Sequence, residues 1–192
     1  MSRLSSKYDG EGERININFP NKKYNIIYAD PPWKYKFNWG NGSAENDYDT
    51  MTLENIKNLP VKNITDDNCQ LYLWTTNPFL VSGESIEVVK AWGFEPKQLL
   101  TWAKTYKNGE LEMGMGYYYR NCTEQIIFAT KGKVKLLNKN TRNLHIVINP
   151  KQHSKKPDYF RDMIVRCSGD LPRIELFARE RVNGWDAWGN EI

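Results

Sequence analysis

The stretch Y-N-I-I-Y-A-D-P-P-W at residues 24–33 decides the expected fold. Residues 24–29 are mostly apolar, β-branched or aromatic, and this pattern predicts a strand buried on both faces of a parallel sheet. Pro31 and Pro32 lack backbone N–H groups, so the strand cannot continue as a ladder past Asp30. Because open α/β sheets bind ligands beyond the carboxyl ends of their strands, Asp30 is the first candidate for a functional site.

The residues Asp30, Pro31, Pro32 and Trp33 suit transfer of a group to an exocyclic aromatic amine. The lone pair of such an amine is delocalised into the ring, which makes it a poor nucleophile. The Asp30 carboxylate and the proline-fixed carbonyl of Pro31 can each accept an amino proton, while Trp33 offers a flat face to a base. The plainer alternative is a proline turn after a strand, with Asp30 as a cap.

Length and composition set broad limits on the protein. A chain of 192 residues is expected to form one domain over residues 1–192, with the polar residues 1–14 loose. Seven tryptophans and eleven tyrosines exceed the needs of a core and suit stacking on bases. The net charge of +4 permits a nucleic-acid partner without requiring one.

The cysteines and apolar runs bear on location and metal content. Cys69, Cys122 and Cys167 are far apart and the chain has two histidines, which argues against a structural zinc site. We expect no metal and reduced cysteines in a cytoplasmic compartment. Residues 1–14 lack an apolar signal region, and no apolar run is long enough to predict a membrane span.

Periodicity and turn residues predict alternating strands and helices. Residues 15–19 alternate as a short edge strand or a cover over the pocket, and Thr52 caps a short helix that ends near Leu59. The further strands are expected at 70–75, 98–102, 125–129 and 173–177, and the further helices at 79–92 and 157–167. This order predicts a mostly parallel, three-layer α/β sheet.

Three other segments are candidates for contact with a substrate. The long loop at 34–50 carries Trp39 and Tyr48, and is either a gate with stacking groups or a surface loop. The run G-M-G-Y-Y-Y-R at 114–120 predicts a flexible aromatic loop rather than a dinucleotide loop. Residues 131–156 hold eight Lys or Arg and no acidic residue, which fits either a solvated face or contacts with phosphates.

Four separated pieces of the chain resemble one protein family. Y-A-D-P-P-W at 28–33 resembles the amine-acceptor motif of N6-adenine methyltransferases. G-M-G-Y-Y-Y-R-N-C-T-E at 114–124 and H-S-K-K-P-D at 153–158 are similar to segments of the MT-A70 family. I-E-L-F-A-R at 174–179, followed by G-W-D-A-W-G-N-E at 184–191, resembles the C-terminal signature of that family. The resemblance covers residues 24–192.

The resemblance implies a Rossmann-like fold of permuted order that uses S-adenosylmethionine (SAM), with the catalytic motif before the cofactor-binding strand. It places Asp30, Pro31, Pro32 and Trp33 at catalysis, with Asp30 also near the amino group of SAM. The positions that match cofactor contacts are Asp30, Lys156, Glu175, Arg179, Arg181, Asn190 and Glu191, although residue types at 181 and 191 vary in the family. The simpler alternatives are a surface lysine, a Glu175–Arg179 ion pair and an asparagine in a turn.

The function that these observations predict is methyl transfer from SAM to N6 of adenine in nucleic acid, with DNA favoured and the base flipped out of the helix. The residues expected to contact the substrate are Trp39, Tyr48, Tyr117, Arg120, Lys133, Lys135 and Lys139. The open alternatives are an RNA substrate, a non-catalytic nucleic-acid-binding subunit, and an amine on a protein or small molecule. Since no target-recognition module is evident, we expect a homodimer or a partner subunit.

Overall fold

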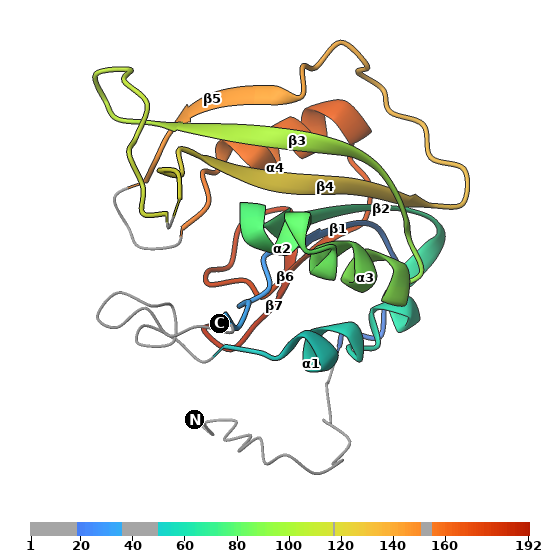
Figure 1. The fold of residues 1–192 in the computed structure, drawn as a ribbon. Helices are drawn as coiled ribbons and strands as arrows, with labels where there is room; N and C mark the ends of the chain where they lie inside the picture. Colours follow the sequence, from blue (N-terminus) through green and yellow to red (C-terminus); the bar gives the residue numbers. More distant parts are fainter. Residues whose placement is uncertain (1–18, 36–49, 117, 151–154) are drawn as a thin grey trace.

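The computed structural model describes residues 19–35, 50–116, 118–150 and 155–192. Within these ranges seven strands form one sheet, in the order β5-β3-β4-β2-β1-β6-β7 (Figure 1). The strands are β1 (Tyr24–Ala29), β2 (Thr65–Thr75), β3 (Glu95–Thr105), β4 (Thr123–Lys131), β5 (Leu144–Ile148), β6 (Arg173–Leu176) and β7 (Asp186–Trp188). Strand β4 is antiparallel to β2 and β3, and the other pairings are parallel. The expected mostly parallel sheet is confirmed.

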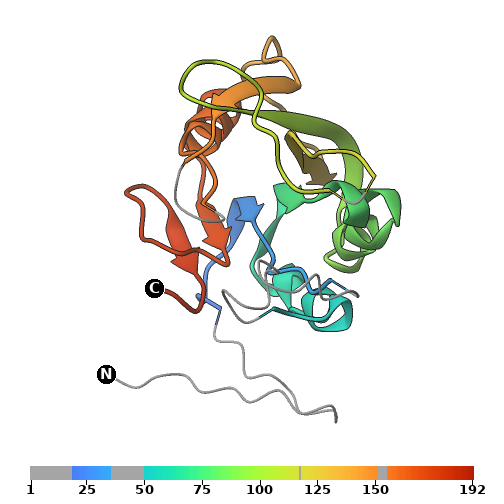
Figure 2. The same ribbon diagram turned by 60° about the vertical axis from the view of Figure 1, so that its left-hand side comes forward.

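Helices cover both faces of this sheet (Figures 1 and 2). Helices α1 (Leu53–Lys57), α2 (Asn77–Val81) and α3 (Glu84–Ala91) lie on one face, together with a 3-10 turn, η2 (Val61–Asn63). Helix α4 (Tyr159–Ser168) packs on the other face. The three-layer Rossmann-like arrangement expected from the sequence is therefore confirmed.

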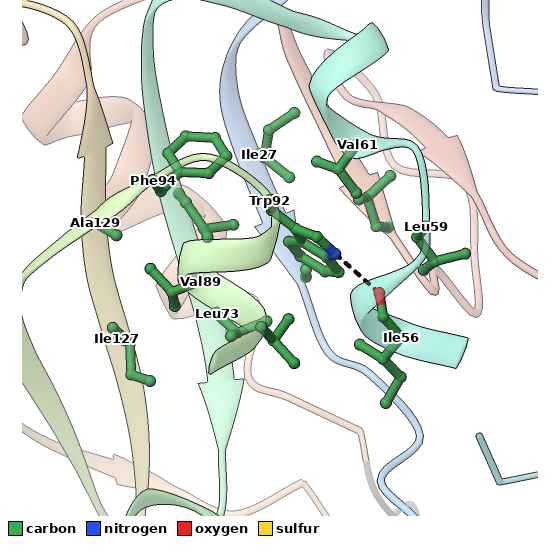
Figure 3. Close-up of a cluster of buried hydrophobic side chains, with 14 of the residues drawn as sticks. Ile27, Ile56, Leu59, Val61, Leu73, Val89, Trp92, Phe94, Ile127 and Ala129 are labelled. Carbon is green, nitrogen blue, oxygen red and sulfur yellow. Dashed lines mark hydrogen bonds between the residues drawn. The ribbon is translucent and has the colours of Figure 1, made fainter. Parts of the chain in front are cut away.

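Strand β1 is buried on both faces, as the sequence predicts. Ile27 and Ala29 join the core under α1 and α3, whereas Ile26 and Tyr28 join the core under α4. Because successive side chains of a strand point to opposite faces, β1 contributes to a hydrophobic layer on each face of the sheet. In the first layer, the Trp92 indole N–H donates to the carbonyl of Ile56 at 2.9 Å, which joins the end of α3 to α1 (Figure 3).

Several elements differ from the expectation. The helix predicted over 79–92 is interrupted at Gly83, whose φ of 85° lies in the left-handed region that favours glycine. Strands β2 and β3 extend beyond the predicted 70–75 and 98–102. Strands β5 and β7 were not predicted, because their apolar residues lie within a basic segment and a C-terminal turn. Residues 15–18 lie outside the described residues.

Other expectations concern the cysteines, a membrane span and a metal. All three cysteines are unpaired thiols. Among the described residues, no helix combines the length and the apolar character that crossing a membrane requires. In the same part of the chain, no group of three or more His, Cys, Asp or Glu side chains could hold a metal ion.

The strand directions define two edges of the sheet. We call the edge where β1, β2, β3, β5 and β6 end the carboxyl edge, and the opposite one the amino edge. Because β4 is antiparallel, Thr75 at the end of β2 pairs with Gln125 near the start of β4, whereas Cys69 pairs with Lys131. Asp30 and Glu124 thus lie at the carboxyl edge, and Lys131 lies toward the amino edge.

Candidate active site at the carboxyl edge

Asp30 lies directly after β1, between the ends of β2 and β6. Its neighbour Ala29 pairs with Leu73 on one side and Leu176 on the other. The Lys156 ammonium donates to an Asp30 carboxylate oxygen at 2.8 Å, and the Asp30 side chain keeps 24% of its exposure. The structure therefore brings together two predicted site residues that are far apart in the sequence.

Lys156 continues into a chain of alternating charges. Its ammonium lies 3.3 Å from the second carboxylate oxygen of Glu124, whose other oxygen accepts from Lys104. The same ammonium lies over the Trp74 ring, 5.3 Å from its centroid. We call Asp30, Lys156, Glu124 and Lys104 the ionic chain; its members come from four separate segments.

Burial and pairing act in opposite directions on these groups. Burial raises the pKa of Asp30, and the neighbouring Lys156 offsets part of that rise. Burial would lower the pKa of Lys156, but Asp30 and Glu124 outweigh it and raise that pKa. Burial also opposes ionisation of Glu124, yet Lys156 and Lys104 hold the pKa of its carboxyl below the ordinary value. Lys156 is therefore the common counter-ion of two carboxylates.

The Asp-Pro-Pro-Trp corner is held by backbone bonds. The Pro31 carbonyl accepts the Trp33 N–H at 2.9 Å, and the Pro32 carbonyl accepts the Met51 N–H at 2.8 Å. A carbonyl oxygen has two lone pairs, so the Pro31 oxygen retains one for a substrate. The corner is thus pre-shaped, as the prolines predict.

Trp33 does not take the place expected of it. Its side chain is 5% exposed, its ring stacks on Phe79 at 5.1 Å, and its indole N–H donates to the Trp74 carbonyl at 3.2 Å. The prediction that Trp33 offers a free face to a base is corrected, because in this arrangement its ring packs into the core and supports the corner. The aromatic residues that line the cavity described next are Tyr35, Trp102 and Tyr106, none of which the sequence analysis selected.

A cavity of about 800 Å³ opens beside the ionic chain. It is lined by Lys104, Glu124 and Lys156, by Met115 from the β3–β4 connection, and by Asn149 after β5. This volume lies within the range of small-molecule and cofactor sites. Lys156 both lines the cavity and pairs with Asp30, so the cavity lies next to the corner at Asp30.

Glu175 in β6 is held by a residue that the sequence analysis missed. Arg161 of α4 donates from Nε to one Glu175 oxygen at 2.7 Å and from Nη2 to the other at 3.1 Å. Arg161 is 7% exposed and also contacts Asp158 and Glu180. Arg161, rather than Arg179 alone, is therefore a counter-ion of Glu175. The sequence feature that could have indicated this role is that Arg161, a charged residue, directly follows Phe160 within the apolar pattern of α4.

The remaining predicted cofactor residues lie beyond β6 and around the end of β7. Arg179 Nε lies 3.5 Å from a Glu191 oxygen, and the Ala178 N–H donates to the Trp188 carbonyl at 3.0 Å. Arg181 and Asn190 are exposed. These residues flank the same edge as Asp30 and Glu175, since β6 lies between β1 and β7.

The predicted substrate residues divide between the two edges. Arg120 is exposed shortly before β4, at the carboxyl edge. Lys133, Lys135 and Lys139 are exposed after β4, at the amino edge. From Glu124 to Lys131, β4 runs about 23 Å at ~3.3 Å per residue. The structure therefore does not bring these three lysines to Asp30; Trp39, Tyr48 and Tyr117 lie outside the described residues.

Comparison with known proteins identifies the family. The MT-A70 family model matches residues 24–191, which include Asp30, Lys156 and Glu175. The chain belongs to the MT-A70 family. The resemblance that the sequence motifs suggested is thereby confirmed, and the carboxyl-edge site lies entirely within the matched part of this MT-A70 protein.

Individual relatives differ in how much of their length is shared. The chain is 36% identical to the Type II methyltransferase M.MunI of Mycoplasma sp, over 90% of this chain and 79% of that protein. It is 28% identical to the human N(6)-adenosine-methyltransferase catalytic subunit METTL3, over 88% of this chain. It is also 28% identical to a probable N(6)-adenosine-methyltransferase MT-A70-like protein of Oryza sativa subsp. japonica. The chain spans about a quarter of the length of these two N(6)-adenosine-methyltransferase relatives: 28% of the human protein and 26% of the Oryza sativa protein.

Proposed function

We propose that this MT-A70 protein transfers a methyl group from SAM to N6 of adenine in DNA. The observation that carries the proposal is the position of Asp30: a partly exposed carboxylate at the carboxyl end of β1, paired with Lys156 at 2.8 Å and followed by a rigid pair of prolines. Two acceptors in fixed positions are what an aromatic amine needs to become a nucleophile.

The residues around the site fit SAM by their chemistry. SAM carries a carboxylate, an ammonium group, a ribose diol and an adenine. Lys156 can bind the carboxylate, Asp30 the ammonium group, and Glu175 the hydroxyls, while Asn190 offers a donor and an acceptor to the ribose or base. Arg179 and Glu191 lie along the same edge. When bound, SAM supplies an electrophilic methyl group on its positively charged sulfur.

The chain's own residues then prepare the adenine. Asp30 accepts one amino proton in a hydrogen bond, and the free lone pair of the Pro31 carbonyl accepts the other. Lys156 orients the Asp30 carboxylate and favours its ionised form. Trp33, stacked on Phe79, supports the corner from the core, and Tyr35 is an aromatic residue of the cavity that can border the base.

The choice of DNA over RNA follows from the pattern of similarity. The chain shares more identity and more of the relative's length with the Type II methyltransferase than with relatives named for adenosine, a ribonucleoside. A cytoplasmic location and a second subunit or second copy that aids target recognition remain part of this proposal.

Methyl transfer to defined substrates tests the proposal. The purified chain is incubated with labelled SAM and, separately, with duplex DNA, single-stranded DNA and RNA, and the products are digested and identified by mass. We expect N6-methyladenine in DNA, and its loss in Asp30→Asn at SAM concentrations that still saturate the variant, whose SAM binding is weakened but measurable. Label in RNA alone would reverse the substrate assignment. Equal activity of wild type and Asp30→Asn would remove Asp30 from catalysis.

A further inference from the structure

We propose that the connection between β3 and β4 carries a wedge that enters duplex DNA beside the target adenine and fills the space that the flipped base leaves. The wedge consists of Met113, Met115, Tyr118 and Tyr119. This inference rests on the proposed function and extends it. It states that the substrate is duplex DNA rather than an unpaired strand, and that the chain itself opens the duplex.

The wedge residues are large, apolar or aromatic, and turned to solvent. Met113 and Met115 are each 71% exposed, and Tyr118 and Tyr119 are each 87% exposed. Single exposed apolar residues are common on protein surfaces, but a group gathered on one loop marks a surface that binds something.

The backbone of this loop is folded back on itself and held there. The Gly114 N–H donates to the Asn121 carbonyl at 2.8 Å, and the Asn121 side-chain amide donates to the Met115 carbonyl at 2.9 Å. A Cβ at Gly116 would lie within 1.9 Å of the Tyr119 carbonyl oxygen, so the two arms approach too closely for any side chain there. Over residues 114–116 and 118–121 the loop is therefore a narrow, doubled chain, with Met115, Tyr118 and Tyr119 on its arms and Met113 at its base.

The wedge stands at the mouth of the proposed adenine site. Met115 lines the same cavity as Lys156 and Glu124, and the connection extends beyond the ends of β3 and β4 (Figure 1). Lys107 and Arg120 are exposed on either side of it along the chain. Apolar and aromatic side chains next to a cavity large enough for a base, with Lys107 and Arg120 on either side and, among the described residues between them, only Glu110 exposed as an acidic residue, suit a duplex in which stacked bases lie between rows of phosphates.

The chemistry of the wedge fits a gap in a base stack. Proteins that kink or open DNA insert apolar side chains, methionine among them, between base pairs, and aromatic rings stack on bases whatever their sequence. Extrusion of a base leaves such a gap. Filling it with Met113 and Tyr119 stabilises the open duplex and thereby favours the flipped adenine.

A double substitution, Met113→Ser with Tyr119→Ser, tests the wedge. The control carries Leu137→Ser and Ile146→Ser, two similarly exposed apolar residues away from the loop. Each protein is assayed on unmethylated genomic DNA, either as native duplex or as heat-denatured single strands. We expect the wedge variant to lose about tenfold or more of its rate on duplex and less than about twofold on single strands, with the control unchanged on both. Equal losses on both substrates would overturn the proposal.

Permanganate footprinting tests the same step without methyl transfer, because permanganate oxidises thymines that have lost their pairing partner. We expect the wild type to create reactive thymines in duplex DNA, and the wedge variant and Gly116→Ala to lose them. Reactive thymines without methyl transfer would uphold the wedge while refuting the proposed function. The absence of reactive thymines with the wild type would overturn the wedge. So would the finding that the wild type is a dimer that the double substitution converts to monomers, because a second copy of the chain would then cover this surface.

Discussion

The two edges of the sheet bury polar groups of different kinds. At the carboxyl edge the groups withdrawn from solvent are charged: Asp30 and Lys156 are partly buried, and Glu175 and Arg161 are buried. Toward the amino edge, the buried cluster is neutral. There the Gln70 side-chain oxygen accepts from Tyr72 at 2.9 Å and from Ser168 at 2.7 Å. Lys133 on that edge is exposed, whereas Arg173 at the start of β6 keeps only 12% of its side-chain exposure and pairs with the exposed Asp170.

This difference shows at which edge of the sheet folding carries the free-energy cost of burying charged groups. A buried charge loses its hydration and regains it only through well-placed partners, whereas a neutral hydrogen-bonded cluster costs little. A neutral cluster suffices to join β2 to the end of α4. Charges are kept inside at the edge where a carboxylate has to meet a substrate, and stability is commonly sacrificed at such sites.

Asp30→Asn is expected to give the largest effect on activity. The amide keeps the shape but its NH₂ donates where the carboxylate accepts, so methyl transfer should fall by about 10²–10⁴-fold, the range for loss of a positioned proton acceptor. Labelled transfer at saturating SAM measures this loss.

The same variant should not destabilise the fold at neutral pH. Because burial raises the pKa of Asp30, its ionised form disfavours folding, so that its contribution to stability is present at low pH and lost as the pH rises through the folded pKa. Thermal unfolding should show Asp30→Asn at least as stable as wild type at pH 7, with the difference vanishing in acid. A strongly destabilised variant at pH 7 would contradict this account of the carboxyl edge.

Arg161→Met is expected to give the largest effect on stability. It leaves Glu175 buried without its bidentate partner, a change that costs about 3–5 kcal/mol. Denaturant unfolding measures the loss, and the double variant Arg161→Met with Glu175→Gln should recover most of it, because it removes the buried charge. If the double variant is no more stable than the single one, Arg161 acts through packing rather than through Glu175.

The parts of the site that could be predicted from the sequence are those that local sequence determines, and the parts that could not be predicted depend on contacts between distant segments. Strand β1 and the corner at Asp30 could be predicted because local sequence, an apolar run stopped by prolines, determines them. Arg161 and the ionic chain could not be predicted from pattern alone, since their partners come from separate elements and only the sheet order brings them together. The position of Lys133 depended on the direction of β4, which strand patterns do not reveal. Trp33 was misjudged because an aromatic residue beside a site suits the core equally well.

Lys156→Gln should shift the pH dependence of the reaction. Since Lys156 offsets part of the rise in the pKa of Asp30, its removal should move the acid limb of kcat to higher pH, where the carboxylate loses its proton. A kcat profile at saturating SAM separates this effect from weaker cofactor binding. An acid limb that stays in place would assign the limb to another group.

Gln70→Leu probes the neutral cluster. Tyr72 and Ser168 each lose an acceptor, although their oxygens lie 3.3 Å apart and can pair with each other. We expect a loss of about 1–3 kcal/mol in unfolding free energy with methyl transfer unchanged. A loss as large as that of Arg161→Met would show that the two edges do not differ in the way proposed.

Charge reversal at Lys133, Lys135 and Lys139 should have the smallest effect on chemistry. These lysines are separated from Asp30 by the length of β4, beyond the ~8 Å over which salt screens exposed charges at physiological ionic strength. We expect kcat to remain within about twofold of wild type, whereas reversal of Arg120 at the carboxyl edge lowers methyl transfer. If the lysines bind phosphates outside the target site, the slope of log affinity against log salt will flatten by about 0.9 for each phosphate that is no longer neutralised. A fall in kcat larger than that of Arg120→Glu would mean that the amino edge takes part in the reaction.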